Sequence, residues 1–338
     1  MRRSVPAEAV RAFPTRGRRS AIAGLGSCVP ERVLTNADLQ LIVDTSEQWI
    51  VERTGIRRRH VAEAGTASHQ LGAVAALRAL EAARVTADEV DLLIVTSSSP
   101  DAPFPAMACR VQEAIGAERA VAYDLLAACT GWLYGMSVAD AQVAAGRIET
   151  ALVVGAETLS RIVDWSDRST CVLLGDAAAA AVVRPAPAGS GFRSWCLGSD
   201  GRRWDLLTFG AFAETGAYAA HDPDPRFRMR GPETFKVAVE IFVEQSRAVL
   251  AAAGACVEEV DLFVPHQANR RIMEAAARRL GIPLEKVVVN IDEYGNTSTA
   301  TIPLALEEAL RDGRLRTGAQ VLMASFGAGL TWSAALLA

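Results

Sequence analysis

The sequence repeats a pattern at an interval of about half its length. The segment AARVTADEVDLLI at residues 82–94 is matched by AAGACVEEVDLFV at residues 252–264. ALVVGA, which begins at Ala151, pairs with QVLMAS, which begins at Gln320, and VAYD, which ends at Asp124, pairs with VVNID, which ends at Asp292. Three matches in the same order and at nearly one spacing indicate that the chain consists of two similar halves, and this limits the folds available to it.

Each half alternates helices with short strands. A helical pattern over residues 71–80 precedes a strand at 91–96, and a second strand near 121–126 precedes a helix at about 130–145. A third strand follows at residues 150–155. These strands are apolar without alternation, as is typical of strands buried on both faces, so helices must cover both sides of each sheet. The pattern predicts an α/β protein whose two halves form a layered αβαβα sandwich.

The boundaries of the halves follow from the repeat. We assign residues 20–190 to the N-terminal half and residues 191–338 to the C-terminal half. Residues 1–19 are rich in arginine and lack the apolar stretch of a secretory signal. They are predicted to form a disordered extension, the alternative being a start codon placed too far upstream.

Composition excludes several classes of protein. Of the 338 residues, 50% are hydrophobic and 22% charged, as is typical of globular proteins. Apolar runs such as residues 177–183 are far shorter than the ~18 residues that a membrane helix needs. The net charge of −4 offers no basic field for nucleic acid. The six cysteines are scattered without a Cys-x-x-Cys pair, so no metal site or disulfide framework is expected, and a reducing cytoplasm is the predicted location.

Cys129 is the strongest candidate nucleophile. It lies in YDLLAACTGWLYGMSVADAQVAAG, between a predicted buried strand and a predicted helix, with Gly131 close by. The geometry is that of a nucleophile elbow, in which a sharp strand-to-helix turn exposes the reactive side chain. The unpaired N–H groups and the dipole at a helix N-terminus favour a thiolate. The alternative is a buried cysteine that only fills the core.

His266 is a candidate partner of Cys129. It lies in VDLFVPHQANRRI, between a strand that ends at Pro265 and a helix that Asn269 is expected to cap. Strand C-terminal ends are where α/β folds commonly place their sites. A histidine with a purely structural role is the alternative for this residue taken alone.

Asn296 is the third candidate. It lies in YGNTSTA, between a strand predicted over residues 287–291 and a helical run at residues 302–310. The interval between Asp124 and Asp292 places the counterpart of Cys129 at position 297, within this segment. A pseudo-twofold axis would therefore bring both helix starts to one centre, although a turn residue is the other explanation for Asn296. The glycine-rich turn FGAGLTW at residues 326–332 offers N–H groups that could stabilise an oxyanion.

The combination of these motifs resembles the β-ketoacyl-acyl-carrier-protein synthase III family of the thiolase superfamily. The matching segments lie in the family's order and together span residues 21–338. They are NADL (36–39), DTSEQWIVERTGIRRRH (44–60), AACTG (127–131), SVAD (137–140), VPHQANRRI (264–272), YGNTSTA (294–300) and FGAGLTW (326–332).

The resemblance implies a thiolase-like fold and a decarboxylative Claisen condensation. Cys129 would take a short acyl group from acyl-CoA as a thioester. His266 and Asn296 would hold the thioester carbonyl of malonyl-acyl-carrier protein and stabilise the enolate formed when carbon dioxide leaves. The N–H groups of Cys129 and Ala328 would form the oxyanion hole for the acyl group. The product would be a 3-oxoacyl-acyl-carrier protein that starts fatty acid synthesis, and no cofactor or metal is implied.

The resemblance also implies a set of binding residues. Trp49 and Arg168 would stack the adenine of coenzyme A, and Arg53 would meet its phosphates. Lys236 and Arg271 would attract the acidic helix of an acyl carrier protein. Taken alone, Lys236 and Arg271 are more often ordinary solvated charges, and a core aromatic is the alternative for Trp49.

Four aromatic residues complete the expectations. Phe104 would cross the interface of a homodimer and close the acyl pocket of the partner, which favours a short primer. Trp132 stands where the family has phenylalanine and is expected near the acyl pocket, with plain core packing as the alternative. Phe235 and Phe326 would support Cys129 and His266, with plain core packing as the alternative.

Some residues depart from the family pattern and keep other functions open. Thr130, Trp132, Ala328 and Leu330 replace smaller or different residues, and bulky leucines occupy positions 125–126. Ala328 can donate its N–H only if its backbone angles suit a residue with a Cβ. Alternatives are a starter-unit ketosynthase or acyltransferase of a polyketide or other secondary-metabolite pathway, a non-catalytic partner subunit, and a cysteine hydrolase. Asn296 argues against ester formation without decarboxylation, and retention of all three reactive residues argues against the partner subunit.

Overall fold

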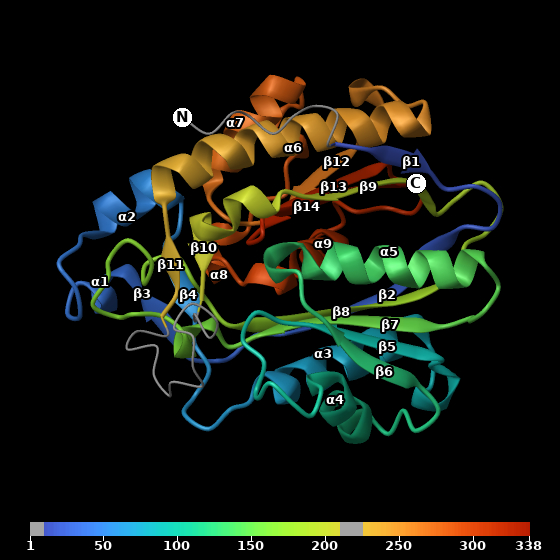
Figure 1. Cartoon of the computed structure of the whole chain (residues 1–338), viewed down its shortest axis with the longest axis horizontal. Coiled ribbons are helices and arrows are strands. Elements are labelled where there is room, and N and C mark those ends of the chain that lie inside the picture. The colour runs from blue at the N-terminus through green and yellow to red at the C-terminus, as the bar shows by residue number, and fades with distance from the viewer. Residues whose placement is uncertain (1–9, 210–225) are drawn as a thin grey trace.

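The computed structural model describes residues 10–209 and 226–338, and two five-stranded sheets form its framework (Figure 1). In the first sheet the strand order is β2-β8-β7-β5-β6. Strands β7, β5 and β6 are parallel, whereas β8 is antiparallel to both of its neighbours. The bounds are β2 Ser20–Cys28, β5 Leu92–Thr96, β6 Val121–Leu125, β7 Ala151–Glu157 and β8 Ala177–Pro185.

The second sheet has the order β1-β9-β14-β13-β12 and repeats the first. Strands β12 and β13 are parallel, and the remaining pairs are antiparallel. The bounds are β1 Ala12–Pro14, β9 Phe192–Ser199, β12 Leu262–Pro265, β13 Val321–Gly327 and β14 Thr331–Leu337. Strands β9, β14, β13 and β12 correspond to β2, β8, β7 and β5, as the sequence repeat requires.

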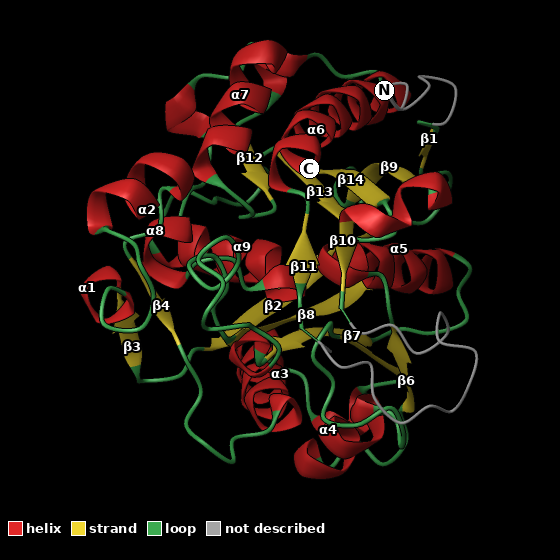
Figure 2. Ribbon diagram, turned by 60° about the vertical axis from the view of Figure 1, so that its left-hand side comes forward, coloured by secondary structure: helices red, strands yellow, loops and turns green. Residues whose placement is uncertain are grey.

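Helices form the other three layers, so the predicted five-layer αβαβα sandwich is confirmed (Figure 2). Helices α3 and α4 cover the outer face of the first sheet, α6 and α7 cover the second, and α5 and α9 lie between the sheets. The bounds are α3 Ser68–Ala83, α4 Met107–Ile115, α5 Gly131–Ala144, α6 Gly231–Ala253, α7 Arg270–Leu280 and α9 Thr301–Arg311. No helix in residues 10–209 and 226–338 is long and apolar enough to cross a membrane.

Smaller elements build a cap over one end of the sandwich. A two-stranded sheet of β3 and β4 lies beside the short helices α1 and α2, and their apolar residues pack with Leu173 and Ile291. Buried Arg59 donates to the carbonyls of Leu34 and Val172 and so ties the cap to the segment that precedes β8. The bounds are α1 Asn36–Leu39, α2 Glu47–Thr54, α8 Ile291–Tyr294, β3 Val33–Thr35, β4 Arg58–His60, β10 Leu207–Thr208 and β11 Arg228–Met229.

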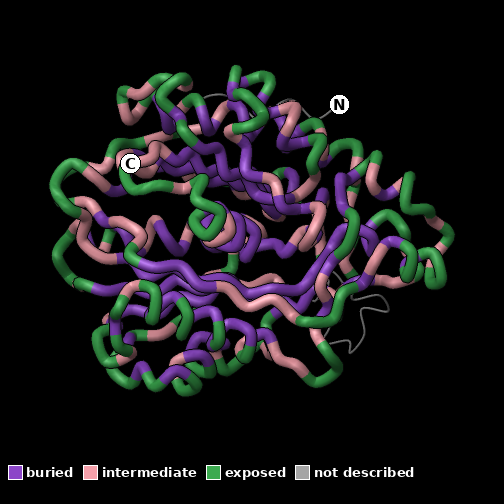
Figure 3. Tube along the Cα trace, turned by 180° about the vertical axis from the view of Figure 1, so that it is seen from behind, coloured by how far each residue is buried: buried purple, intermediate pink, exposed green. Residues whose placement is uncertain are grey.

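The core lies where the sequence has apolar runs and every third or fourth residue of a helix is apolar. Residues of β5, β7 and β8 are buried on both faces, as the absence of alternation predicts. Figure 3 shows the buried residues concentrated in the sheets and in the layer between them. The expected cap of α7 is confirmed, because the side chain of Asn269 accepts a hydrogen bond from the N–H of Arg271.

Two expectations about local structure need correction. Residues 1–19 are not a disordered extension throughout, because Ala12–Pro14 form β1 and pair antiparallel with β9, and Arg18 pairs with Glu149. Backbone hydrogen bonds to a neighbouring strand hold a short edge strand, and arginine-rich composition does not reveal them. Residues 1–9 lie outside the described ranges. The strand expected over residues 287–291 is reduced to one bridge between Phe263 and Val287.

Candidate active site

Cys129 lies on a sharp turn between β6 and α5. A single 3-10 turn, Ala128–Thr130, connects the strand to the helix that begins at Gly131. Ala128 has a φ of 45°, a left-handed conformation that is unfavourable for a residue with a Cβ. Strained backbone immediately before the reactive residue is a feature of nucleophile elbows, so the predicted local geometry is present.

The C-terminal half holds this turn from the other side. The Ser298 hydroxyl donates to the Cys129 Sγ over 3.4 Å, and the Ser325 hydroxyl donates to the Cys129 carbonyl over 2.9 Å. The Thr130 hydroxyl lies 2.8 Å from that of Thr331 on β14. Side chains of the second half therefore position the nucleophile of the first.

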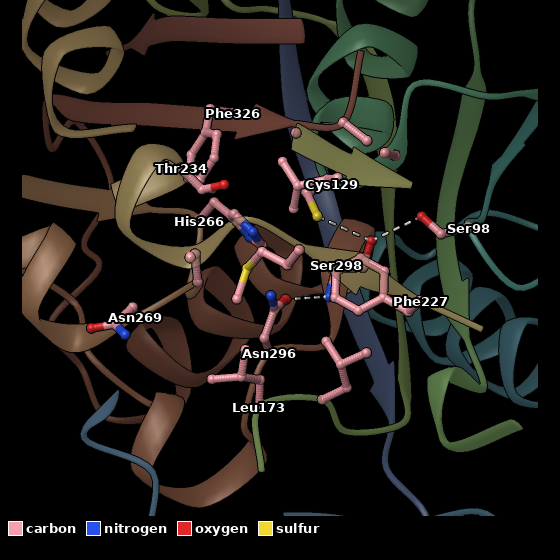
Figure 4. A pocket seen from close by; sticks show the side chains of 18 of the residues that line it. Ser98, Cys129, Leu173, Phe227, Thr234, His266, Asn269, Asn296, Ser298 and Phe326 are labelled. Atoms are coloured by element: carbon pink, nitrogen blue, oxygen red, sulfur yellow. Dashed lines mark hydrogen bonds between the residues drawn. The ribbon is translucent and has the colours of Figure 1, made fainter. Parts of the chain in front are cut away.

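Asn296 lies on the equivalent turn before α9. Its Oδ1 accepts a hydrogen bond from the N–H of Ser298 over 2.8 Å, as Figure 4 shows. Because the amide oxygen is engaged by the backbone, the Nδ2 group is the end available to a ligand as a donor. Gly295 allows the chain to approach the segment before β8, since a Cβ there would lie 2.9 Å from the Leu173 carbonyl oxygen. Its φ of 66° also favours glycine.

His266 follows β12 and is 1% exposed. Its Nδ1 lies 2.7 Å from the Thr301 hydroxyl, and its ring meets Phe326 edge to face at 6.2 Å between centroids. Burial lowers the pKa of His266 to about 3, so the imidazole is neutral at physiological pH. A neutral imidazole can donate one hydrogen bond to a developing negative charge.

The glycine-rich turn after β13 completes the site. A Cβ at Gly327 would lie 2.9 Å from the N–H nitrogen of Cys129, so glycine allows the two segments to touch. Ala328 is not among the described non-glycine residues with positive φ, which are Arg84, Ala128 and Ser298. The backbone of Ala328 therefore accommodates its Cβ without the strain present at Ala128.

These residues line one cavity of about 980 Å³. Cys129, His266, Asn296, Ser298 and Phe326 all border it, as do residues 327–329 (Figure 4). The rest of its wall is mostly apolar and comes from Leu126, Leu173, Leu174, Leu207, Phe227 and Met229, among others. The cavity can therefore hold an apolar chain beside the thiol, with polar groups converging at one end.

The protonation state of Cys129 differs from the sequence-based expectation of a thiolate. Burial raises the pKa of Cys129 to about 11, and the hydrogen bond from Ser298 acts in the opposite direction. The buried carboxyl of Glu157, whose own pKa burial raises, adds further to the pKa of the thiol. Desolvation therefore outweighs the favourable helix terminus, and the resting group is a thiol.

The expected coenzyme A residues are close together at the cavity mouth. The guanidinium carbons of Arg53 and Arg168 lie 4.8 and 5.1 Å from the ring centroid of Trp49. Trp49 and Arg53 border the cavity. The Arg168 guanidinium donates to the Asp44 carbonyl over 3.0 Å, which holds it beside the indole. The indole and the two guanidinium groups therefore form one cation–π cluster.

The positions of the other predicted residues vary. Lys236 and Arg271 lie on neighbouring helices α6 and α7, and the Arg271 guanidinium lies 5.6 Å from the ring centroid of Phe235. Phe235 and Phe326 border the cavity, as expected. Phe104 is 83% exposed.

Trp132 does not border the cavity, contrary to expectation. It is 1% exposed, packs between the two sheets, and donates its indole N–H to the Val153 carbonyl over 3.3 Å. Position 132 is nearly one helical turn beyond the nucleophile and faces β7. Its bulk therefore belongs to the core, and the cavity wall near Cys129 comes instead from residues 126–128.

Sequence reasoning missed several polar residues of the site. Ser298 contacts both the nucleophile and Asn296, and its hydroxyl lies 3.1 Å from that of Ser98. Thr301 contacts His266. Buried Glu157 accepts the N–H groups of residues 98 and 99 and shapes that loop. The signal for Ser298 and Thr301 was present, because both lie in or directly after the NTSTA segment that contains Asn296.

The chain matches known proteins over most of its length. Residues 123–201 match the model described as 3-oxoacyl-[acyl-carrier-protein (ACP)] synthase III, and residues 250–338 match its C-terminal model. A protein of Desulfitobacterium hafniense named beta-ketoacyl-[acyl-carrier-protein] synthase III is 50% identical over 94% of this chain and 96% of its own length. The chain belongs to the 3-oxoacyl-[acyl-carrier-protein] synthase III family. Members of this family are acyl-transferring condensing enzymes.

Solved structures of the synthase III family have the same fold. The 3-oxoacyl-[acyl-carrier-protein] synthase III of Aquifex aeolicus superposes with a TM-score of 0.89 at 44% identity, over 94% of this chain and 99% of that chain. The priming β-ketosynthase of the R1128 polyketide pathway also gives a TM-score of 0.89, at 36% identity over 96% and 97% of the two chains. The thiolase-like architecture expected from the sequence motifs is therefore confirmed.

Proposed function

We propose that this synthase III joins a short acyl group from acyl-CoA to the two-carbon unit of malonyl-acyl-carrier protein. The observation that carries the proposal is the convergence of Cys129, His266 and Asn296 on one apolar cavity. Two steps, acyl transfer to the cysteine and decarboxylative condensation, use different members of this set. The proposed reaction uses only side chains, backbone N–H groups and the two thioester substrates.

The first step makes the acyl-enzyme. Cys129 releases its thiol proton to water as its sulfur attacks the carbonyl carbon of acyl-CoA, and the carbon–sulfur bond to coenzyme A breaks. The departing thiolate takes up a proton, so coenzyme A leaves as the free thiol. Charge on the carbonyl oxygen develops in the tetrahedral intermediate, where the N–H groups of Cys129 and Ala328 are the proposed donors.

The second step forms the new carbon–carbon bond. The malonyl carbon–carboxylate bond breaks, carbon dioxide leaves, and the electron pair moves into an enolate. The Asn296 amide and the neutral His266 ring are the proposed donors to the enolate oxygen. The carbanion attacks the Cys129 thioester, the carbon–sulfur bond to the enzyme breaks, and the departing thiolate takes up a proton from water to restore the thiol. The product is a 3-oxoacyl-acyl-carrier protein, as fatty acid initiation requires.

Two binding partners, coenzyme A and an acyl carrier protein, are proposed from the residues near the opening of the cavity. Trp49, Arg53 and Arg168 are proposed to bind the adenine and phosphates of coenzyme A, with the base entering beside the indole. Trp49→Ala should raise the KM for acyl-CoA more than it lowers kcat. The cations Lys236 and Arg271 are proposed to attract an acidic carrier protein, so Lys236→Glu should raise the KM for malonyl-acyl-carrier protein alone.

A homodimer is proposed from the edge of the first sheet. Strand β6 is at this edge, and its Val121 and the neighbouring Leu126 are 64% and 79% exposed. Together with the exposed Phe104, they are the apolar side chains that a second copy is proposed to cover. Light scattering should give twice the chain mass, and Val121→Lys should shift it to the monomer. The six cysteines, all within the described residues and free, are compatible with the proposed cytoplasmic location.

Fatty acid initiation is preferred over a polyketide starter role. Identity is 50% to the D. hafniense synthase III but 36% to the R1128 priming ketosynthase. The deciding experiment incubates the protein with short, branched and aromatic acyl-CoAs and measures the intact mass and the modified peptide. We expect one acyl group on Cys129, no adduct in Cys129→Ala, and an unchanged adduct in Cys109→Ala, a matched control at an exposed cysteine. Acylation of Cys129→Ala would overturn the proposal.

A further inference from the structure

The hydrogen bond to His266 raises a question about its ring proton. His266 is buried and neutral, so its imidazole carries one proton, on either Nδ1 or Nε2. Nδ1 lies 2.7 Å from the Thr301 hydroxyl, which is also buried. The choice of nitrogen decides what His266 can offer in the cavity, since Nε2 is a donor in one tautomer and an acceptor in the other.

The Thr301 hydroxyl has one proton and two acceptors within reach. It lies 2.7 Å from His266 Nδ1 and 2.9 Å from the carbonyl oxygen of Ser298. The Ser298 carbonyl already accepts the backbone N–H of Thr301. It therefore stays hydrogen-bonded when the hydroxyl turns away, whereas Nδ1 has no other hydrogen-bond partner in residues 10–209 and 226–338. The proton is consequently free to point at the ring.

We propose that Thr301 is a positioning residue that donates its hydroxyl proton to His266 Nδ1 and thereby keeps the ring proton on Nε2. This inference rests on the proposed function for its catalytic consequence, because only the Nε2–H tautomer donates to an enolate oxygen. The opposite tautomer, with Nδ1–H donating to Thr301, would direct a lone pair at that oxygen and raise the barrier to decarboxylation. Thr301 occupies the first position of α9, which fixes its hydroxyl relative to the ring.

Three variants test the role in the reaction. Thr301→Val keeps the shape and removes the donor, Thr301→Ser restores it, and Thr297→Val is the matched control because the buried Thr297 hydroxyl has no hydrogen-bond partner among the described residues. We expect Thr301→Val to slow decarboxylation of malonyl-acyl-carrier protein about tenfold, with acylation of Cys129 unchanged. Thr301→Ser and Thr297→Val should stay near the wild-type rates. Equal losses in both steps, or no loss in either, would overturn the proposal.

Nitrogen-15 NMR of histidine-labelled protein tests the tautomer without any reaction. The His266 signals, assigned by their absence from His266→Ala, should show a protonated Nε2 and an unprotonated Nδ1 between pH 5 and 8. The Nδ1 signal should move in Thr301→Val, because it loses its donor, and not in Thr297→Val. A protonated Nδ1 in the wild type would overturn the proposal even if condensation is observed. Conversely, the NMR spectra could show the expected tautomer while no acyl-CoA modifies Cys129. That combination would refute only the proposed function.

Discussion

The turns that precede α5 and α9 have nearly the same backbone and different chemistry. Ala128 and Ser298 occupy equivalent places on the two turns and have φ values of 45° and 49°. The turn residues two positions later agree as well, with φ, ψ of −88°, −8° at Thr130 and −80°, −11° at Ala300. The backbone therefore pairs Cys129 with Thr299, and the interval between Asp124 and Asp292, which points to position 297, is wrong by two positions here.

The corrected pairing shows which residues differ between the halves. The counterpart of Cys129 is Thr299, and the same interval pairs His266 with Thr96. Those two threonines are buried and their hydroxyls lie 2.6 Å apart, as a structural pair between the halves. One copy of the duplicated turn thus carries the nucleophile, and the other supplies donors such as Asn296 and Ser298. The difference shows that two halves can preserve a backbone while dividing the steps of one reaction between them.

The division of the reaction between the two turns is tested most strongly at Asn296. Asn296→Ala should slow decarboxylation by about 10²–10³, since it removes one donor at the developing oxyanion, and should leave acylation of Cys129 intact. Release of carbon dioxide and the intact acyl-enzyme mass measure the two steps separately. Thr299→Val, which changes the counterpart of the nucleophile, should retain both steps. Full condensation by Asn296→Ala would mean that the second turn does not serve the enolate.

A smaller effect is expected at Gly327, where the two halves are in close contact. Gly327→Ala would bring a Cβ to 2.9 Å from the Cys129 nitrogen, which forces the nucleophile turn away from the glycine-rich turn. We expect a loss of about 1–3 kcal/mol in the free energy of unfolding and at least a tenfold slower acylation. Gly201→Ala is the control, because a Cβ at that position meets nothing within 4 Å. Denaturant unfolding and the rate of adduct formation measure both quantities; an unaffected Gly327→Ala would contradict the close contact.

The smallest effect concerns the hydrogen bond that joins the two turns. With the pKa of Cys129 at about 11, alkylation by iodoacetamide should rise about tenfold per pH unit from pH 7 to 10. Ser298→Ala removes a donor that lowers this pKa, so the midpoint should move up and the rate at pH 8 should fall about fivefold. The substitution adds no new backbone strain, because serine and alanine both carry a Cβ and Ala128 adopts the same left-handed conformation. A plateau below pH 8 in the wild type would show that the resting group is a thiolate after all.

The fold could be predicted in large part from the repeat and from the apolar runs. Strands β5 and β7 and helix α5 fall where periodicity places them, and Cys129, His266 and Asn296 do border one cavity. Local pattern could not reveal β1, because a three-residue edge strand is held by its neighbour and not by its own composition. Local pattern also predicted a strand over residues 287–291, of which only Val287 forms a bridge to β12.

Finer properties of the site depended on three-dimensional context. The direction of the Cys129 pKa shift is set by desolvation in the folded protein, which a helix-start argument cannot weigh. Trp132 was expected at the acyl pocket because it stands where the family has phenylalanine, yet its indole donates to the Val153 carbonyl between the sheets. Ser298 and Thr301 gain their roles only from contacts across the pseudo-twofold axis or around a helix start.

The protonated thiol of the partly buried Cys129 also bears on how long the protein survives between turnovers. Peroxide and other oxidants in a cell attack thiolates far faster than thiols, and their products beyond the sulfenic acid are largely irreversible. A nucleophile that retains its proton while it waits for substrate is a poor target for such damage, whereas the exposed Cys109 and Cys256 would meet an oxidant first. The desolvation that lowers the reactivity of the resting Cys129 thiol therefore also protects its sulfur from oxidation.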